Sequence, residues 1–109
     1  MNLTLYVWQR ATAALIAPMV LVHLAVIFYA TRHGLTAADI LGRLRGSFVW
    51  GGFYVLFVVA ASIHAGIGIR NVLSEWSPLA DRTADISAAV FGLFLLGLGL
   101  RAVAAVALP

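Results

Sequence analysis

The chain has 109 residues, of which 63% are hydrophobic and only 10% are charged, whereas a soluble domain carries roughly 25% charged residues, so an ordinary soluble domain is excluded. Its net charge of +3 comes from seven arginines and four acids that flank long apolar stretches, which is typical of membrane-facing proteins and argues against nucleic-acid binding. The chain has no cysteine, which excludes thiolate catalysis and cysteine-ligated clusters.

The first predicted element is a membrane-spanning helix over about residues 11–31. Residues 1–9 precede it as a short amphipathic lead, with Tyr6 and Trp8 as anchors at the membrane interface. The span has about the 20 apolar residues that a helix needs to cross the hydrocarbon. Pro18 lies inside it, so we expect a kink at that point.

Polar residues follow the first span, and a short interfacial helix over residues 37–44 is predicted, with Thr36 as its cap. The second span is expected over about residues 48–70 and the third over about residues 87–108. The sequence therefore predicts an all-α membrane protein, a single domain over residues 1–109 with three transmembrane helices. Close-packing points are expected in the third span at Gly92, Gly97 and Gly99.

An ionisable residue inside a span is costly and is a functional candidate by default. His64 lies six residues before Arg70, roughly 9 Å inside that end of the second span. Gly68 follows one turn later on the same face, so the imidazole lies beside a surface without large side chains. Such a surface suits a flat haem, and His64 would then bind the haem iron. Arg70 and Arg10 belong to the same end and could pair with haem propionates. The alternative is a histidine that only hydrogen-bonds a neighbouring helix.

Three further residues carry open alternatives. His23 is about 10 Å deeper in the membrane than His64, so the two histidines do not easily bind one iron. It is either a packing residue or the ligand of a second haem nearer the opposite face. Glu75 and Trp76 follow the second span at its charged end. Glu75 could pair with an arginine or handle a proton, and the alternative is a solvated helix end.

Two stretches resemble the small membrane anchor subunit of succinate dehydrogenase. One is WQRATAALIAP, from Trp8 to Pro18, which contains the Arg-x-Thr-Ala pattern of that family's first membrane helix. The other is SIHAGIGIRNVLSEWSPLADR, from Ser62 to Arg82, which resembles the family's His-x-x-x-Gly followed seven residues later by an acid and an aromatic. Order, spacing and the three-span layout agree over most of the chain.

The resemblance implies roles for several residues. His64 matches the family's axial haem b ligand, with the second axial histidine on the other anchor subunit. Arg10 matches an arginine near the propionates and the quinone pocket. Glu75 and Trp76 match an acid–tyrosine pair at the ubiquinone, but the indole N–H of Trp76 has no hydroxyl to pass a proton. Arg70 instead follows the companion anchor, which carries Gly-Ile-Arg after its haem histidine.

The resemblance also implies the function and the partners. The chain is expected to be the haem b-binding half of a heterodimeric anchor bundle that passes electrons from an iron–sulfur subunit to ubiquinone or menaquinone. It has no catalytic residue for succinate, which a flavoprotein subunit would oxidise. The implied location is a membrane, the bacterial inner membrane, with the N-terminus on the cytoplasmic side. Alternatives are a fumarate reductase anchor, a two-haem b-type cytochrome anchor and a non-redox membrane protein.

Overall fold

A computed structural model of the chain describes residues 2–109, and over these residues it contains helices and no strands. The elements are α1 (Leu3–His33), α2 (Ala37–Leu44), α3 (Phe48–Trp76) and α4 (Asp81–Ala107). Helices α1, α3 and α4 have 31, 29 and 27 residues and are long and apolar enough to cross a membrane. At 1.5 Å per residue the shortest of them is about 40 Å long. The prediction of an all-α protein with three transmembrane helices is confirmed.

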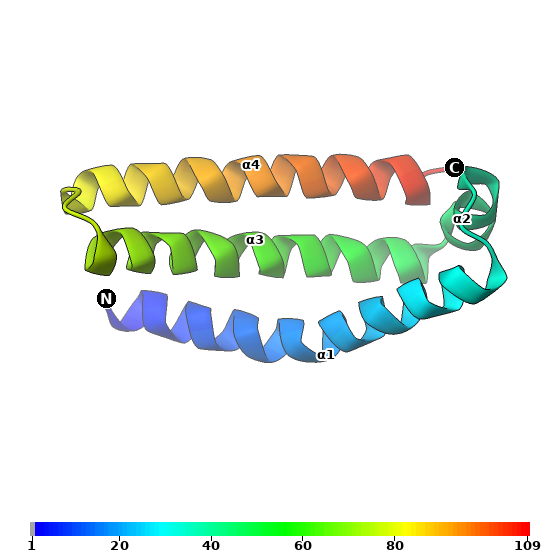
Figure 1. Cartoon of the computed structure of the whole chain (residues 1–109), viewed down its shortest axis with the longest axis horizontal. Coiled ribbons are helices and arrows are strands. Elements are labelled where there is room, and N and C mark those ends of the chain that lie inside the picture. The colour runs from blue at the N-terminus through cyan, green and yellow to red at the C-terminus, as the bar shows by residue number, and fades with distance from the viewer. Residues whose placement is uncertain (1) are drawn as a thin grey trace.

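Helix α3 is the centre of the bundle. It lies between α1 and α4 and packs against both, while α2 lies across one end (Figure 1). The start of α1 and the connection from α3 to α4 lie together at the other end, which we call the N-terminal end (Figure 1). We call the opposite end, which holds α2 and the C-terminus, the α2 end. The molecule measures 48 × 22 × 22 Å, the shape of a short transmembrane bundle.

Helix α1 begins earlier than the predicted first span. The side chain of Asn2 caps it by accepting a hydrogen bond of 2.8 Å from the backbone N–H of Leu5. Residues 3–9, which belong to the expected amphipathic lead, are therefore the first turns of one continuous helix, because interfacial aromatic residues do not interrupt it. Figure 1 shows α1 bending near its middle, where Pro18 lies and where its ring removes a backbone donor.

The connection into α2 is held by a capping box. Thr36 caps the helix as predicted, and the Asp39 carboxylate accepts hydrogen bonds from both the hydroxyl and the backbone N–H of Thr36. These two hydrogen bonds, the side-chain one first, hold the pKa of Asp39 below its ordinary value. Gly34 precedes the box with a φ of 134°, and a Cβ there would clash with the Asp39 carboxylate.

Glycines set the spacing of α3 and α4. The Cα of Gly92 would lie only 3.7 Å from a Cβ placed at Gly66, and a Cβ placed at Gly92 would lie 3.4 Å from the carbonyl oxygen of Ser62. A Cβ at Gly99 would clash with the side chain of Val58. Gly92 and Gly99 are thus close-packing points, as predicted. Gly97 is not, because a Cβ there would meet nothing within 4 Å among the described residues.

The α2 end is closed by backbone hydrogen bonds. Gly46, which lies between α2 and α3, donates its N–H to the carbonyl of Ala107 at 2.7 Å. Ala107 is the last residue of α4, so this bond satisfies one of the carbonyls that the end of a helix leaves without a partner. Arg43 of α2 donates to the carbonyl of Gly34 at 2.8 Å and so ties α2 to the end of α1.

Candidate functional site

The site forms where α1 meets α3 near the N-terminal end. The two helices run antiparallel, and this register places Thr12 of α1 opposite His64 of α3 (Figure 1). Nδ1 of His64 lies 3.3 Å from the hydroxyl oxygen of Thr12. That hydroxyl also lies 2.7 Å from the carbonyl oxygen of Trp8, one turn earlier on α1. Thr12 is only 5% exposed, so its hydroxyl is buried between the helices, while His64 is partly buried.

Gly68 and Gln9 form the next layer of this interface. A Cβ placed at Gly68 would lie 3.5 Å from the side-chain nitrogen of Gln9, in ordinary van der Waals contact. Gly68 therefore lies on the α1 side of α3, one turn beyond His64 as the spacing predicts. The side-chain oxygen Oε1 of Gln9 is buried and has no hydrogen-bond partner within residues 2–109. A buried acceptor of this kind favours a ligand or a partner that brings a donor.

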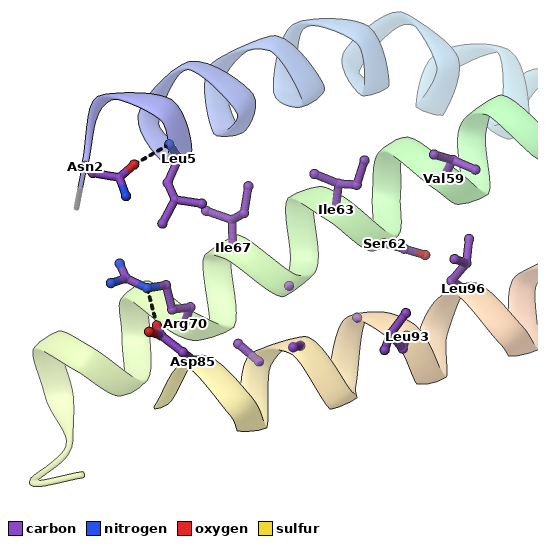
Figure 2. A pocket seen from close by; sticks show the side chains of 14 residues that line it. Asn2, Leu5, Val59, Ser62, Ile63, Ile67, Arg70, Asp85, Leu93 and Leu96 are labelled. Carbon is purple, nitrogen blue, oxygen red and sulfur yellow. Dashed lines mark hydrogen bonds and ion pairs between the residues drawn. The ribbon is translucent and has the colours of Figure 1, made fainter. Parts of the chain in front are cut away.

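Arg70 is directed to a different neighbour. Its Nε donates to Oδ1 of Asp85 on α4 at 2.7 Å, an ion pair that ties the ends of α3 and α4 together. Figure 2 shows this pair at one end of a pocket of about 560 Å³ between the start of α1, α3 and α4. His64 does not line that pocket. The structure thus brings Arg70 to Asp85 and does not bring it to the imidazole.

Arg10, Glu75 and Trp76 lie at the N-terminal end, all exposed. The Arg10 guanidinium carbon lies 5.8 Å from the centre of the Tyr6 ring, within the range of a cation–π contact. Trp76 is 83% exposed at the last residue of α3, and Glu75 makes no ion pair with the rest of the described chain. Since Gln9 faces Gly68, Trp76 lies roughly 12 Å further out along the bundle than Arg10. None of the three lines either of the two pockets described here.

His23 lies in a separate environment toward the α2 end. Its Nδ1 is 3.2 Å from the Tyr54 hydroxyl, and its ring centre is 5.5 Å from the Tyr54 ring and 5.4 Å from the Phe57 ring. Tyr54 precedes His64 by ten residues, which is roughly 15 Å along α3, so the two histidines lie further apart along the bundle than the expected 10 Å. His23 lines a pocket of about 900 Å³ that is closed at one end by α2.

The donor set fits one axial position of a haem. Residues 2–109 hold no group of three or more His, Cys, Asp or Glu side chains that could bind a metal ion without further ligands. A haem asks less of the protein, because the macrocycle supplies four nitrogen ligands and the protein supplies the axial ones. His64 offers one imidazole whose Nε2 makes no hydrogen bond in the described chain, and Gly68, one turn on, adds no side chain to the face that packs against Gln9.

Comparison with known protein families gives the class of the chain. A family model described as succinate dehydrogenase/fumarate reductase transmembrane subunit matches residues 1–106. The chain belongs to this family. No curated protein and no solved structure matches it in the corresponding comparisons. The resemblance drawn from the two stretches is therefore confirmed, and with its three apolar helices the chain is an integral membrane subunit that works with other subunits of that complex.

Three participants in this region were not predicted from the sequence. Thr12 lies inside the Arg-x-Thr-Ala pattern of this succinate dehydrogenase/fumarate reductase subunit, but its role as a partner of His64 requires the register of α1 against α3. Gln9 lies one turn from it and requires the same register. Asp85 pairs with Arg70 across the turn between α3 and α4. If neighbouring helices are assumed to run antiparallel, the residues opposite His64 and Arg70 can be counted along the chain, and this count could have suggested all three residues.

Proposed function

We propose that this chain is the haem b-binding anchor subunit of a succinate dehydrogenase and that it helps to pass electrons from an iron–sulfur subunit to a membrane quinone. The observation that carries the proposal is His64, a partly buried imidazole inside a spanning helix with Gly68 one turn away. The family match supports the class of complex. The expected location is the bacterial inner membrane.

The residues of this chain would hold the haem through the axial bond of His64. When bound, haem supplies a centre that takes up and releases one electron at a time. Gly68 leaves the α1 side of α3 free of a side chain beside the imidazole. Arg10 makes no ion pair within residues 2–109 and could donate charge-assisted hydrogen bonds to a propionate. Arg70 shares its guanidinium with Asp85, so any propionate contact from it would use the remaining N–H groups.

The quinone is proposed to bind at the N-terminal end, near Arg10 and Trp76. Either ubiquinone or menaquinone has carbonyl oxygens that need hydrogen-bond donors, and a polar headgroup is best accommodated near the interface. Arg10 can donate several hydrogen bonds and stabilise negative charge, while Trp76 can donate one. Glu75 is exposed beside Trp76 and could exchange protons with solvent. The roughly 12 Å between the two levels would be bridged by the long side chains and the headgroup together.

The chain is proposed to act as one half of an anchor made of two subunits. A six-coordinate haem needs a second axial ligand, and His23 lies roughly 15 Å from the level of His64. The second ligand would come from a second membrane anchor, and the soluble partners would be an iron–sulfur subunit and a flavoprotein. Large apolar side chains are exposed along the three long helices, which suits contact with lipid and with a partner helix.

Co-expression of the four subunits tests this proposal. The purified complex is expected to show a low-spin haem spectrum and to reduce quinone with succinate. Without this chain, the soluble subunits should still reduce an artificial soluble acceptor but not quinone. This chain purified alone should bind haem poorly. A complete complex without haem, or stable bis-histidine haem in the isolated chain, would contradict the proposed two-subunit anchor.

A further inference from the structure

We propose that Thr12 is a positioning residue for His64: its hydroxyl fixes which imidazole nitrogen carries the proton and so presents Nε2 to the haem iron. This inference rests on the proposed function, because it concerns the same axial ligand. It depends on the hydrogen-bond geometry between α1 and α3, which no sequence pattern displays.

The proton count at the Thr12 hydroxyl gives the direction of the bonds. The hydroxyl has one proton, and its nearest acceptor is the Trp8 carbonyl oxygen at 2.7 Å, with the Gln9 carbonyl oxygen at 3.2 Å. Both carbonyls can only accept, so the proton of Thr12 goes to the shorter bond, with Trp8. The hydroxyl oxygen can then only accept at Nδ1 of His64, 3.3 Å away. Nδ1 must therefore carry the imidazole proton.

The opposite arrangement is less favourable. If Nδ1 accepted from Thr12, the hydroxyl would give up its bond to the Trp8 carbonyl for a longer one. Thr12 is 5% exposed, so solvent does not easily provide a replacement donor or acceptor. Groups left unpaired in such a place are costly, which favours the fully satisfied arrangement.

The consequence concerns the other nitrogen of His64. A neutral imidazole with its proton on Nδ1 has its lone pair on Nε2, the state that a metal requires. A hydrogen bond from Nδ1–H to an oxygen also makes the ring a stronger electron donor and holds its orientation. Stronger donation favours the ferric over the ferrous form, so Thr12 lowers the midpoint potential of a haem bound there.

His23 offers a matched contrast within the same chain. Its Nδ1 lies 3.2 Å from the Tyr54 hydroxyl, but that hydroxyl has no other partner in the described part of the chain. The phenol proton is therefore free to point toward the ring or away from it, and the tautomer of His23 is not fixed. Tyr54→Phe is accordingly the control variant, since it removes a hydroxyl from a histidine that the proposal does not place on the iron.

Variants in the assembled complex test the role of Thr12. Thr12→Val removes the hydroxyl and keeps the side-chain shape, while Thr12→Ser keeps the hydroxyl and loses a methyl group. The measurements are the haem midpoint potential by redox titration, the electron paramagnetic resonance spectrum of the ferric haem, and haem retained per complex. We expect Thr12→Val to raise the midpoint potential, to change the ferric spectrum and to lose haem more readily. Thr12→Ser and Tyr54→Phe should match the wild type.

Each outcome decides a separate question. A Thr12→Val complex with the potential and spectrum of the wild type overturns the inference and leaves the proposed function standing. Equal shifts in Thr12→Ser and Thr12→Val also overturn it, since packing and not the hydroxyl would then matter. A wild-type complex without haem, which is measured first, overturns the proposed function and the inference with it.

Discussion

The two ends of the bundle each hold one histidine against a hydroxyl, and the two pairs differ in what else holds that hydroxyl. At the N-terminal end, His64 meets Thr12, whose oxygen is tied to the Trp8 carbonyl of its own helix. Toward the α2 end, His23 meets Tyr54 amid aromatic rings. The hydroxyl beside His64 is fixed by a backbone carbonyl, whereas the hydroxyl beside His23 has no other partner in the described part of the chain.

The comparison shows why burial alone does not identify a ligand. Both imidazoles are partly buried in spanning helices, and both make a hydrogen bond through Nδ1. Two features distinguish His64 from His23: Gly68 lies one turn further along the helix, and Thr12 fixes the proton on Nδ1 of the imidazole. Packed rings of Tyr54 and Phe57 surround His23, which supports the packing alternative for that residue. The following experiments test this difference.

The largest effect is expected from removing one histidine at a time. His64→Ala in the assembled complex should abolish or strongly perturb the low-spin haem spectrum, because the iron loses an axial ligand. His23→Ala should leave that spectrum in place and only loosen packing near Phe57. Absorbance difference spectra and haem per complex are the measurements. Loss of haem on His23→Ala with an unchanged spectrum on His64→Ala would reverse the comparison.

The next effect concerns space on the α1 side of α3. Gly68→Leu should lower haem content several-fold, because the larger side chain projects beside His64 and against Gln9. Gly97→Leu is the matched control, since a Cβ there meets nothing within 4 Å among residues 2–109, and we expect the complex to assemble normally.

Gly92→Leu is a less clean control than Gly97→Leu. Its side chain would enter the contact with Gly66 and force α3 and α4 apart, and overpacking of this kind costs roughly 1–3 kcal/mol. We still expect the amount of haem per assembled complex to fall more in Gly68→Leu than in Gly92→Leu. Equal haem per assembled complex in all three variants would mean that Gly68 is not a clearance residue.

A smaller effect is expected at the proposed quinone site. Arg10→Ala should slow succinate-dependent quinone reduction about tenfold or more, because a charged donor to the carbonyl is lost. Trp76→Phe removes one neutral hydrogen bond, worth about 1 kcal/mol, and should slow it roughly fivefold. Reduction of an artificial soluble acceptor should stay at the wild-type level. If both variants reduce quinone as fast as the wild type, the site lies elsewhere, such as on the partner anchor.

The smallest effect concerns pH at the α2 end. Asp39 has a lowered pKa in the folded chain because Thr36 donates to its carboxylate. The stabilisation is therefore present above the unfolded pKa and is lost as pH falls through the folded one. The protection factors for hydrogen exchange over residues 37–44, which correct for the intrinsic exchange rate at each pH, should fall at acidic pH and not at neutral pH. Asp39→Asn should remove most of this pH dependence, while the His64 region should show none of it from this cause.

The fold could be predicted from the sequence because hydropathy and length determine which segments can span a membrane. The start of α1 was not predicted, because Tyr6 and Trp8 indicated an interfacial lead, whereas Asn2 caps a helix that includes them. The prediction of Gly97 as a close-packing point was wrong, because a glycine in an apolar helix indicates close packing only where another backbone approaches it. The limits of the spans within the membrane stay a prediction.

The candidate site could be predicted only for residues whose signal is local. His64 and Gly68 share a helix face, so their spacing along the chain was enough. Thr12, Gln9 and Asp85 act across helices, and each depends on a register that hydropathy does not determine. Arg70 illustrates the same limit. The sequence predicted at which end of the bundle it lies, but it did not predict the ion pair with Asp85.

The hydrogen bond from Gly46 to Ala107 has a consequence for how the protein is made. It joins the turn before α3 to the last residue of α4, so it cannot form while the ribosome is still adding the third spanning helix. The closed form of the α2 end is therefore available only after all three spanning helices have been made.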